Sequence, residues 1–289
     1  MTDRRFRQFN RQRRIFGLAA REREATRIAA GLGRGSPAAQ AFVEETTALT
    51  RDGYVFIEPL ITPSQIDDVL AYLSRHTCTD PYRPRLGAFK APNEVPPDTH
   101  VSHYDNEVII GAPHLLAIAN DPKVLAIVET VLGAKPTIGA LRLWWSTPTP
   151  TGKPEHAENF HRDVDDLRFL KLFVYLTDVD EDAGPHIFAS GSHKQDVLTT
   201  IGRYTDDEVE TAVGSDKITR LCGPAGTSFI ENTYGLHRGL PPRVRPRLVF
   251  QPLYTLRPVI YGPKRPLRQR TAGDPPGLDP YVNRVFLQF

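Results

Sequence analysis

Two short motifs in this sequence place a histidine and an aspartate two positions apart, His161-Arg162-Asp163 and His103-Tyr104-Asp105. Side chains two positions apart point the same way on a β-strand, so such a pair can offer one nitrogen and one oxygen to the same ion. A mononuclear Fe(II) site of the oxygenase type uses two imidazoles and one carboxylate on one face of the metal. A second histidine would then have to come from a distant strand.

The surroundings of the two motifs are different. His161 and Asp163 stand just before the strongest strand pattern in the chain, whereas His103 lies in a stretch rich in proline and without a clear period. We therefore interpret His161 and Asp163 as the metal-binding pair. His103 is expected to belong to a polar loop or lid, with substrate contact as the alternative. A facial triad needs only one carboxylate, so Asp165 and Asp166 are expected to be turn or supporting groups.

The strand that follows the metal-binding pair should have one aliphatic face and one mixed face. Leu170, Leu172, Val174 and Leu176 share the first face, which we expect to pack under helices. The mixed face, expected to line the interior, holds Phe169, Lys171, Phe173, Tyr175 and Thr177. A buried amine needs an acidic partner, which for Lys171 would be Asp165, Asp166 or an acidic ligand. The alternative is a lysine that reaches out from the edge of the strand.

Short strands and a few helices surround this segment. Strand patterns occur at 54–57, 137–146, 168–177, 186–190, 217–222, 227–232 and 247–256, and helical patterns at 38–50, 62–75, 113–119 and 122–132. Short strands separated by turns predict an antiparallel barrel or jelly roll and not a βαβ sheet. Residues 76–106 show no period and are expected to form a lid or binding loop.

The N-terminal segment differs in charge from the rest of the 289-residue chain. Residues 1–34 hold ten arginines against three acidic residues, whereas the whole chain has a net charge of only +2. We expect residues 1–37 to form a basic, partly helical arm with a hinge at Gly31–Pro37, and residues 38–289 to form a single domain. The arm would be solvated, or would pack on the body or on a sister subunit. An anchor for an anionic partner such as nucleic acid, a membrane surface or an acyl carrier is the less favoured alternative.

The remaining composition is typical of a globular protein, with 40% hydrophobic and 24% charged residues. No apolar run approaches the roughly 20 residues that span a bilayer. The only cysteines, Cys78 and Cys222, are far apart and form no CxxC pair, which predicts a reducing, cytoplasmic location.

Several motifs occur together from Leu141 to Tyr254. They are the H-x-D pair, an acidic turn into Gly184-Pro185, Gly191-Ser192-His193, a late histidine and an arginine that opens a strand. In this order and spacing they resemble the phytanoyl-CoA dioxygenase family of Fe(II)/2-oxoglutarate oxygenases. The resemblance implies a mainly β fold with flanking α-helices and a double-stranded β-helix (jelly-roll, cupin-like) core.

The resemblance also implies roles for individual residues. His161, Asp163 and His237 would be the iron ligands and the catalytic residues. Arg247 would bind the distal carboxylate of 2-oxoglutarate as a bidentate pair, in preference to Arg243 and Arg245, which lie in a proline-broken loop.

Further contacts follow from the same resemblance. Tyr175 and Leu143 match positions beside 2-oxoglutarate. Many family members carry a hydroxyl residue two positions after the late histidine, where this chain has Gly239. Another residue, such as Thr233, Lys171 or Tyr175, would have to substitute for that hydroxyl.

Trp145, Phe173 and His103 are the candidate substrate contacts. The two adjacent tryptophans, Trp144 and Trp145, would point to opposite faces of their strand, so that one borders the pocket and the other is core.

The expected function is hydroxylation of an aliphatic carbon of a small molecule, with Fe(II), 2-oxoglutarate and O₂ as cofactor and cosubstrates and with release of succinate and CO₂. The alternatives are desaturation, epoxidation or cyclisation at the same iron site, or a barrel that binds metal and ligand without turnover. A carboxylate at Asp163 argues against halogenation, because related halogenases leave that ligand position to chloride.

Overall fold

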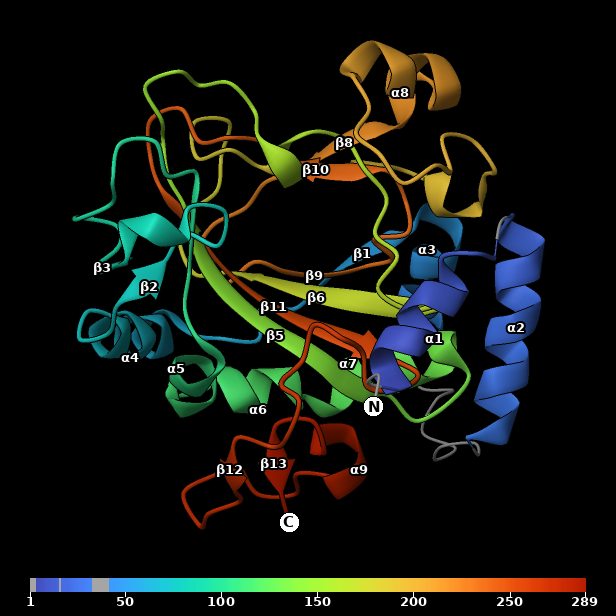
Figure 1. The fold of residues 1–289 in the computed structure, drawn as a ribbon, viewed down its shortest axis with the longest axis horizontal. Helices are drawn as coiled ribbons and strands as arrows, with labels where there is room; N and C mark the ends of the chain where they lie inside the picture. The colour runs from blue at the N-terminus through green and yellow to red at the C-terminus, as the bar shows by residue number, and fades with distance from the viewer. Residues whose placement is uncertain (1–3, 16, 33–41) are drawn as a thin grey trace.

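A large antiparallel sheet forms the centre of the computed structural model, which describes residues 4–15, 17–32 and 42–289 (Figure 1). Its eight strands follow the order β1 (Tyr54–Ile57), β9 (Ser228–Glu231), β6 (Phe169–Tyr175), β11 (Arg247–Thr255), β5 (Thr137–Ser146), β4 (Val101–His103), β2 (Cys78–Thr79) and β3 (Ala88–Phe89). β11 therefore lies between β5 and β6 and pairs with both.

A second, three-stranded sheet has the order β10 (His237–Gly239), β7 (His186–Ala189) and β8 (Ile218–Leu221). Figure 1 shows this small sheet on the opposite side of the large sheet from helices α4 to α7. Two facing antiparallel sheets with flanking helices confirm the predicted mainly β fold class.

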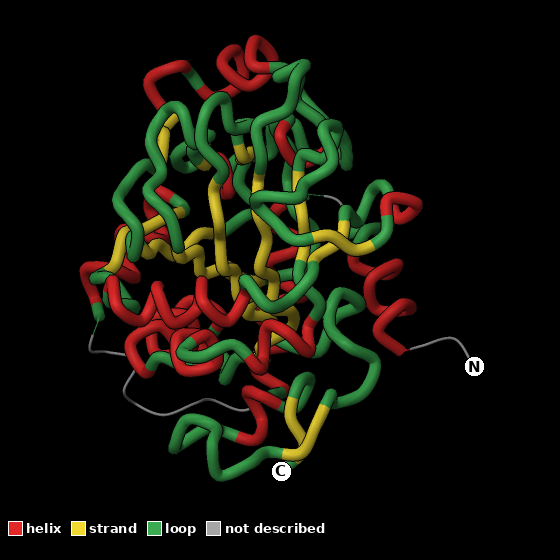
Figure 2. The backbone as a smooth tube through the Cα atoms, turned by 90° about the vertical axis from the view of Figure 1, so that its left-hand side faces the viewer, coloured by secondary structure: helices red, strands yellow, loops and turns green. Residues whose placement is uncertain are grey.

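Helices cover the outer face of the large sheet, as Figure 2 also shows. They are α3 (Val43–Asp52), α4 (Pro63–Leu73), α5 (Asn106–Gly111), α6 (Leu115–Ala119) and α7 (Pro122–Leu132). Leu170, Leu172, Val174 and Leu176 lie in the apolar core with residues of these helices, as the alternation in the sequence predicts. The opposite face of β6 is thereby turned to the space between the two sheets.

The predicted boundaries hold well where the patterns are strong. Thr62 caps α4 by accepting a hydrogen bond from the backbone N–H of Gln65, and α7 ends at Gly133 in a left-handed conformation. The helix predicted over 38–50 corresponds to α3, although residues 38–41 lie outside the described part of the chain, as does most of the predicted hinge.

The prediction of an irregular lid over 76–106 is wrong in part. The segment contributes β2, β3 and β4, which extend the large sheet beyond β5, together with the short helix η2 (Pro84–Leu86). Strands of two or three residues are too short to show alternation, so sequence patterns miss them. The remaining elements are η3 (His156–Glu158), η4 (Ser192–Lys194), α8 (Asp206–Val213), η5 (Ser215–Lys217), β12 (Arg268–Gln269), α9 (Pro280–Asn283) and β13 (Leu287–Gln288).

The basic N-terminal arm packs on the body through α1 (Arg4–Gln12) and α2 (Leu18–Gly31). Nε2 of Gln12 donates hydrogen bonds to the carbonyls of Val164 (2.9 Å) and Asp165 (3.1 Å). Arg21 donates to the carbonyl of Asp166 at 2.8 Å, and its guanidinium lies 4.5 Å from the ring centre of Tyr234. Gln12 and Arg21 are both buried, so part of this charged segment serves packing. In the described part of the chain, no helix combines the length and the apolar character needed to cross a membrane.

Gly184 occupies a position where a side chain should not fit. Its φ is +71°, and a β-carbon there would lie 2.3 Å from the carbonyl oxygen of Leu240. We expect Gly184→Ala to lower the free energy of unfolding by about 2–4 kcal/mol, because left-handed strain adds to the backbone clash. Urea denaturation would measure the loss. Gly202→Ala is the matched control, since no heavy atom lies within 4 Å of that added β-carbon; equal midpoints for the two variants would contradict the expectation.

Candidate metal centre

The structure brings together His161, Asp163 and His237 at the inner edge of the small sheet. His161 and His237 face each other across an isolated antiparallel bridge, in which the two backbones exchange hydrogen bonds of 3.0 and 3.1 Å. The backbone N–H of Asp163 donates to the carbonyl of Thr233 at 2.9 Å. These three backbone contacts hold the segment before β6 against the segment that leads into β10, although the two are far apart in sequence.

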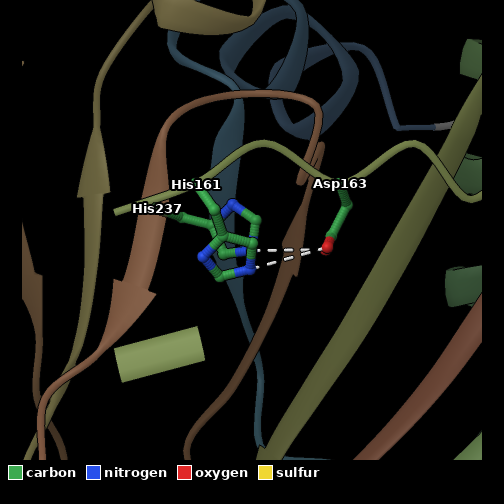
Figure 3. Close-up of side chains that lie close together, drawn as sticks. All are labelled: His161, Asp163 and His237. Atoms are coloured by element: carbon green, nitrogen blue, oxygen red, sulfur yellow. Dashed lines mark ion pairs between the residues drawn. The ribbon is translucent and has the colours of Figure 1, made fainter. Parts of the chain in front are cut away.

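The three side chains converge on one point, as Figure 3 shows. Nε2 of His161 lies 3.6 Å and Nε2 of His237 lies 3.2 Å from the Asp163 carboxylate, and one ligand atom from each residue lies within 4.8 Å of the others. Ligands of about 2.1 Å bond length at right angles on one ion lie about 3 Å apart. The donor set therefore fits a metal ion bound on one face.

Both imidazoles are oriented by the backbone. Nδ1 of His161 donates to the carbonyl of Asn159, and Nδ1 of His237 donates to the carbonyl of Gly235, each at 2.9 Å. A protonated Nδ1 leaves the lone pair on Nε2, the atom that faces Asp163. The neutral form is favoured at His237, because burial lowers the pKa of this histidine.

Lys171 lies beside the triad and forms ion pairs with acidic side chains, as expected for a buried amine. Its Nζ is 2.5 Å from Asp163 and 2.8 Å from Asp165. Burial opposes every charge in this cluster, yet the two carboxylates raise the pKa of Lys171, and its ammonium in turn holds the pKa of Asp163 well below the usual range. Asp163 is thus charged and available to a cation through its other oxygen.

A cavity of about 470 Å³ lies beside the triad. Arg247, the first residue of β11, lines this cavity. Arg247 is 5% exposed, and its Nη2 donates to the hydroxyl of Ser146 at 3.3 Å. Its Nε and Nη1 are buried without a hydrogen-bond partner among the described residues. A buried guanidinium with free donors requires an acceptor, and a ligand carboxylate fits this requirement.

Gly239 and His186 complete the wall next to Arg247. A β-carbon at Gly239 would lie 3.1 Å from Nη2 of Arg247, so glycine at this position leaves room for the guanidinium. His186 is the cross-strand partner of Gly239, and its Nε2 lies 2.9 Å from the buried carboxyl of Glu231. Burial raises the pKa of Glu231 to about 8. His186 and Glu231 thus form a buried polar pair between the two sheets, and His186 lies opposite Gly239.

Besides Arg247, three of the predicted cosubstrate and substrate contacts line this cavity, namely Lys171, Phe173 and His103. His103 belongs to β4, and its ring stacks on Trp144 with centres 5.7 Å apart. Burial lowers the pKa of His103 to about 3. The residue therefore forms part of a neutral cavity wall and not of a polar loop.

Leu143 and Trp145 are placed differently from the prediction. Both lie in the apolar core under the helices, and Trp145 donates to the hydroxyl of Tyr104 at 3.2 Å. The alternation of β5 turns Arg142, Trp144 and Ser146 toward the cavity instead. One of the two tryptophans lines the cavity, and it is Trp144 and not Trp145.

Tyr175 and Thr233 are buried near the centre without lining the cavity. The hydroxyl of Tyr175 donates to the carbonyl of Leu221 at 2.7 Å. The hydroxyl of Thr233 has no partner among the described residues. Arg243 and Arg245 are exposed and pair with Asp182 and Asp180, so they stand away from the cavity.

Asp166 and His193 form hydrogen bonds to the backbone and do not belong to the triad. Asp166 is buried and accepts hydrogen bonds from the backbone N–H groups of Leu167 (2.8 Å) and Leu256 (3.1 Å). Nε2 of His193 contacts the carbonyl of Thr50 at 3.1 Å and so ties η4 to α3.

The cavity residues that sequence reasoning missed include Arg142, Ser146, His186 and Gln251. Alternation along the patterns at 137–146 and 247–256 could have indicated three of them, because each shares a strand face with a residue of interest. His186 gave no such signal, since its strand is only four residues long.

Comparison with known proteins agrees with this geometry. The family model described as phytanoyl-CoA dioxygenase (PhyH) matches residues 49–242. No curated protein matches the chain significantly.

Several solved structures share the fold at low sequence identity. The apoform of EctD from S. alaskensis is 17% identical, with a TM-score of 0.55 over 77% of this chain and 79% of that one. HygX from Streptomyces hygroscopicus, with nickel, 2-oxoglutarate and hygromycin B bound, is 16% identical, with a TM-score of 0.53 over 79% and 92%. The epimerase SnoN, in complex with Fe³⁺, α-ketoglutarate and nogalamycin RO, is 19% identical, with a TM-score of 0.52 over 74% and 83%.

The ion cluster of Lys171 can be tested by asking whether a bound metal ion restores the stability that is lost when Lys171 is replaced. Lys171→Met should lower the free energy of unfolding of the metal-free protein by roughly 3–5 kcal/mol, because Asp163 and Asp165 lose their buried counter-ion. Ni(II) should restore part of this loss, since a cation beside Asp163 replaces the missing positive charge. Urea denaturation with and without Ni(II) would measure both effects.

Lys123→Met provides the control for that test. Lys123 pairs with Glu45 at 2.9 Å near the surface, so its loss should cost about 0–1 kcal/mol and should not depend on metal. An unchanged stability of Lys171→Met, or an equal gain from Ni(II) in both variants, would show that the cluster does not couple to the metal.

Proposed function

This chain belongs to the phytanoyl-CoA dioxygenase (PhyH) family and is an iron- and 2-oxoglutarate-dependent enzyme of the oxygenase type, and from that premise we propose that it hydroxylates an aliphatic carbon of a small molecule. The co-products would be succinate and CO₂. The observation that carries this proposal is the buried Arg247, whose Nε and Nη1 lack partners among the described residues, in one cavity with the His161, Asp163 and His237 triad.

We propose that the triad holds the metal and that Arg247 holds the distal carboxylate of 2-oxoglutarate. When bound, iron and 2-oxoglutarate supply the oxidant derived from O₂. Arg247 would fix the position of the cosubstrate by a bidentate, charge-assisted contact, with Ser146 holding the guanidinium plane. Lys171 would keep the Asp163 carboxylate charged and fixed in direction.

The apolar and aromatic side chains of the cavity would hold the substrate and exclude water. Phe173, Leu253 and the stacked pair of Trp144 and His103 supply these walls. The carboxylate of Asp163 occupies the position that halogenation would require to be empty. The same arrangement would also serve desaturation, epoxidation or cyclisation, which product analysis would separate from hydroxylation by the atoms gained or lost.

We further propose that residues 38–289 form one catalytic domain and residues 1–37 an arm, of which helices α1 and α2 pack against the domain. The large sheet supports a single domain, because it combines strands from both ends of the 54–255 range. A cytoplasmic location belongs to the same proposal. It is supported by the free state of both cysteines, the buried Cys78 and the exposed Cys222.

Anaerobic titration of the apo-protein with Fe(II) and then 2-oxoglutarate tests the central assignment. The visible charge-transfer band of the chelate should appear in the wild type and should be absent in His161→Ala, which loses one ligand of the triad. His114→Ala is the control, because His114 is a partly exposed residue that pairs with Asp68. No band in the wild type, or a band that persists in His161→Ala, would refute the proposal.

Removal of the guanidinium should affect 2-oxoglutarate specifically. Arg247→Met should raise the KM for 2-oxoglutarate by about tenfold to a hundredfold, because a charge-assisted contact worth about 1.5–3 kcal/mol is lost. The readout is 2-oxoglutarate consumption with succinate release. Arg243→Met, which removes a surface arginine, should leave the KM unchanged; a similar rise in both variants would count against a role for Arg247 in binding.

A further inference from the structure

The lysine and arginine side chains that line the cavity differ in whether they form hydrogen bonds or ion pairs with other residues. Lys171 pairs with two aspartates, and Arg162 donates to the carbonyls of Tyr234, Ser192 and other residues of the 192–198 loop. Arg203 is exposed at the rim and donates to two carbonyls. Two guanidiniums remain, those of Arg247 and Arg142. Arg247 is assigned above to 2-oxoglutarate, so Arg142 is the guanidinium left without a hydrogen-bond or ion-pair partner among the described residues.

Arg142 lies on β5 and faces the cavity, where it is half-buried. Among the residues that the structure describes, it forms no hydrogen bond or ion pair, and its clearest contact is the Tyr261 ring, 5.8 Å from the guanidinium. Tyr261 also lines the cavity. A positive charge over an aromatic face keeps all five N–H donors available to a ligand.

The cross-strand partner of Arg142 is Gln251 on β11, which also lines the cavity. Gln251 is 7% exposed, and its side-chain amide likewise makes no hydrogen bond to the described residues. Two adjacent polar groups without partners are costly inside a protein unless a ligand or ordered water satisfies them. The pair therefore presents a second polar subsite in the cavity wall.

This subsite repeats the arrangement around Arg247 on the same two strands. Arg247 is the cross-strand partner of Ser146, and four residues further along β11 Gln251 is the partner of Arg142. Four residues of a β-strand span roughly 13 Å. That spacing between the backbones exceeds the length of a five-carbon dicarboxylate, which favours two separate ligand groups at the two positions.

We propose that Arg142, together with Gln251 and Tyr261, binds an anionic oxyacid group of the substrate. The unpaired donors favour this assignment, which rests on the function proposed above. Two positive charges of iron and one of Arg247 would match Asp163 and the two carboxylates of 2-oxoglutarate, so 2-oxoglutarate does not supply an acceptor for Arg142. A carboxylate or phosphate on the substrate would supply the acceptor that the guanidinium of Arg142 lacks.

The stacked rings of Trp144 and His103 indicate where the rest of such a substrate lies. Trp144 is on the same face of β5 as Arg142, two residues away, so the apolar platform begins directly beside the guanidinium. An acid with an apolar or aromatic body matches this pairing of a charge with a flat wall. The proposed substrate class is therefore a small molecule with one anionic group and an apolar portion that reaches the metal.

Three probes that share a phenyl body and differ in charge test the subsite, namely phenylacetate, phenyl phosphate and phenylacetamide. Isothermal titration into protein saturated with Ni(II) and 2-oxoglutarate keeps the probes away from the metal and from Arg247. The wild type should bind at least one anion about tenfold or more tightly than the neutral amide. The tighter of the two anions identifies a carboxylate or a phosphate as the recognised group.

Arg142→Met should reduce the preference for the anion to less than twofold, and Arg142→Lys should retain part of it. Arg203→Met, which removes a rim arginine of the same cavity, should keep the full preference. Equal binding of acid and amide by the wild type, binding of neither, or a preference that survives Arg142→Met would overturn the proposal. If Arg142→Met does not fold, Gln251→Leu serves as the second variant and should weaken the anion at least threefold.

The charge-transfer band with Fe(II) and 2-oxoglutarate separates this inference from the proposed function. Arg142→Met should retain the band, because neither the triad nor Arg247 is changed. A wild type that lacks the band but prefers the anion would refute the iron assignment and leave the anion subsite standing. A wild type that has the band but shows no preference for the anion would refute the subsite alone.

Discussion

The ion cluster of Lys171 with Asp163 and Asp165 is the interaction on which the organisation of the centre depends. Two carboxylates lie close together in a largely buried space, where each would otherwise raise the pKa of the other. One ammonium lies within 2.8 Å of both and holds the pKa of Asp163 well below its usual range, whereas burial raises the pKa of Asp165. The cluster also fixes the direction of Asp163, whose backbone is already tied to Thr233, so the carboxylate is positioned before any ligand arrives. Metal binding then requires little reorganisation of the protein.

Much of this arrangement could be predicted from the sequence, because the strands involved are long enough to show their period. The alternation in 168–177 correctly assigned the aliphatic face to the helices and placed Lys171 and Phe173 inside. The same rule applied to 137–146 allowed two solutions that differ by one residue, since Trp144 and Trp145 are both aromatic. A shift of one residue exchanges the two faces of a strand, which is why Trp145 was expected on the cavity side. Leu143 was expected there because of the family resemblance.

The features that escaped prediction are those that tertiary contacts create. The partner of Lys171 could be narrowed to a few acids but not chosen, because distances within the turn after Asp163 depend on packing. His186 and Gly239 become neighbours only through the register of β7 with β10, two strands of four and three residues. Similarly, β2, β3 and β4 exist because an edge of the large sheet was available to pair with, and local sequence preference contributes little to such short strands.

The docking of the N-terminal arm also has a consequence for the order in which this protein is assembled. Gln12 and the carbonyls it binds are 152 and 153 positions apart, and Arg21 is 145 positions from its acceptor. During synthesis the arm therefore precedes its acceptors and has to wait until the segment after Asp163 has been made. Contacts between such distant segments form late and slow the folding of a chain. The arm therefore docks late although it is made before its acceptors, and it docks on the backbone beside the metal centre.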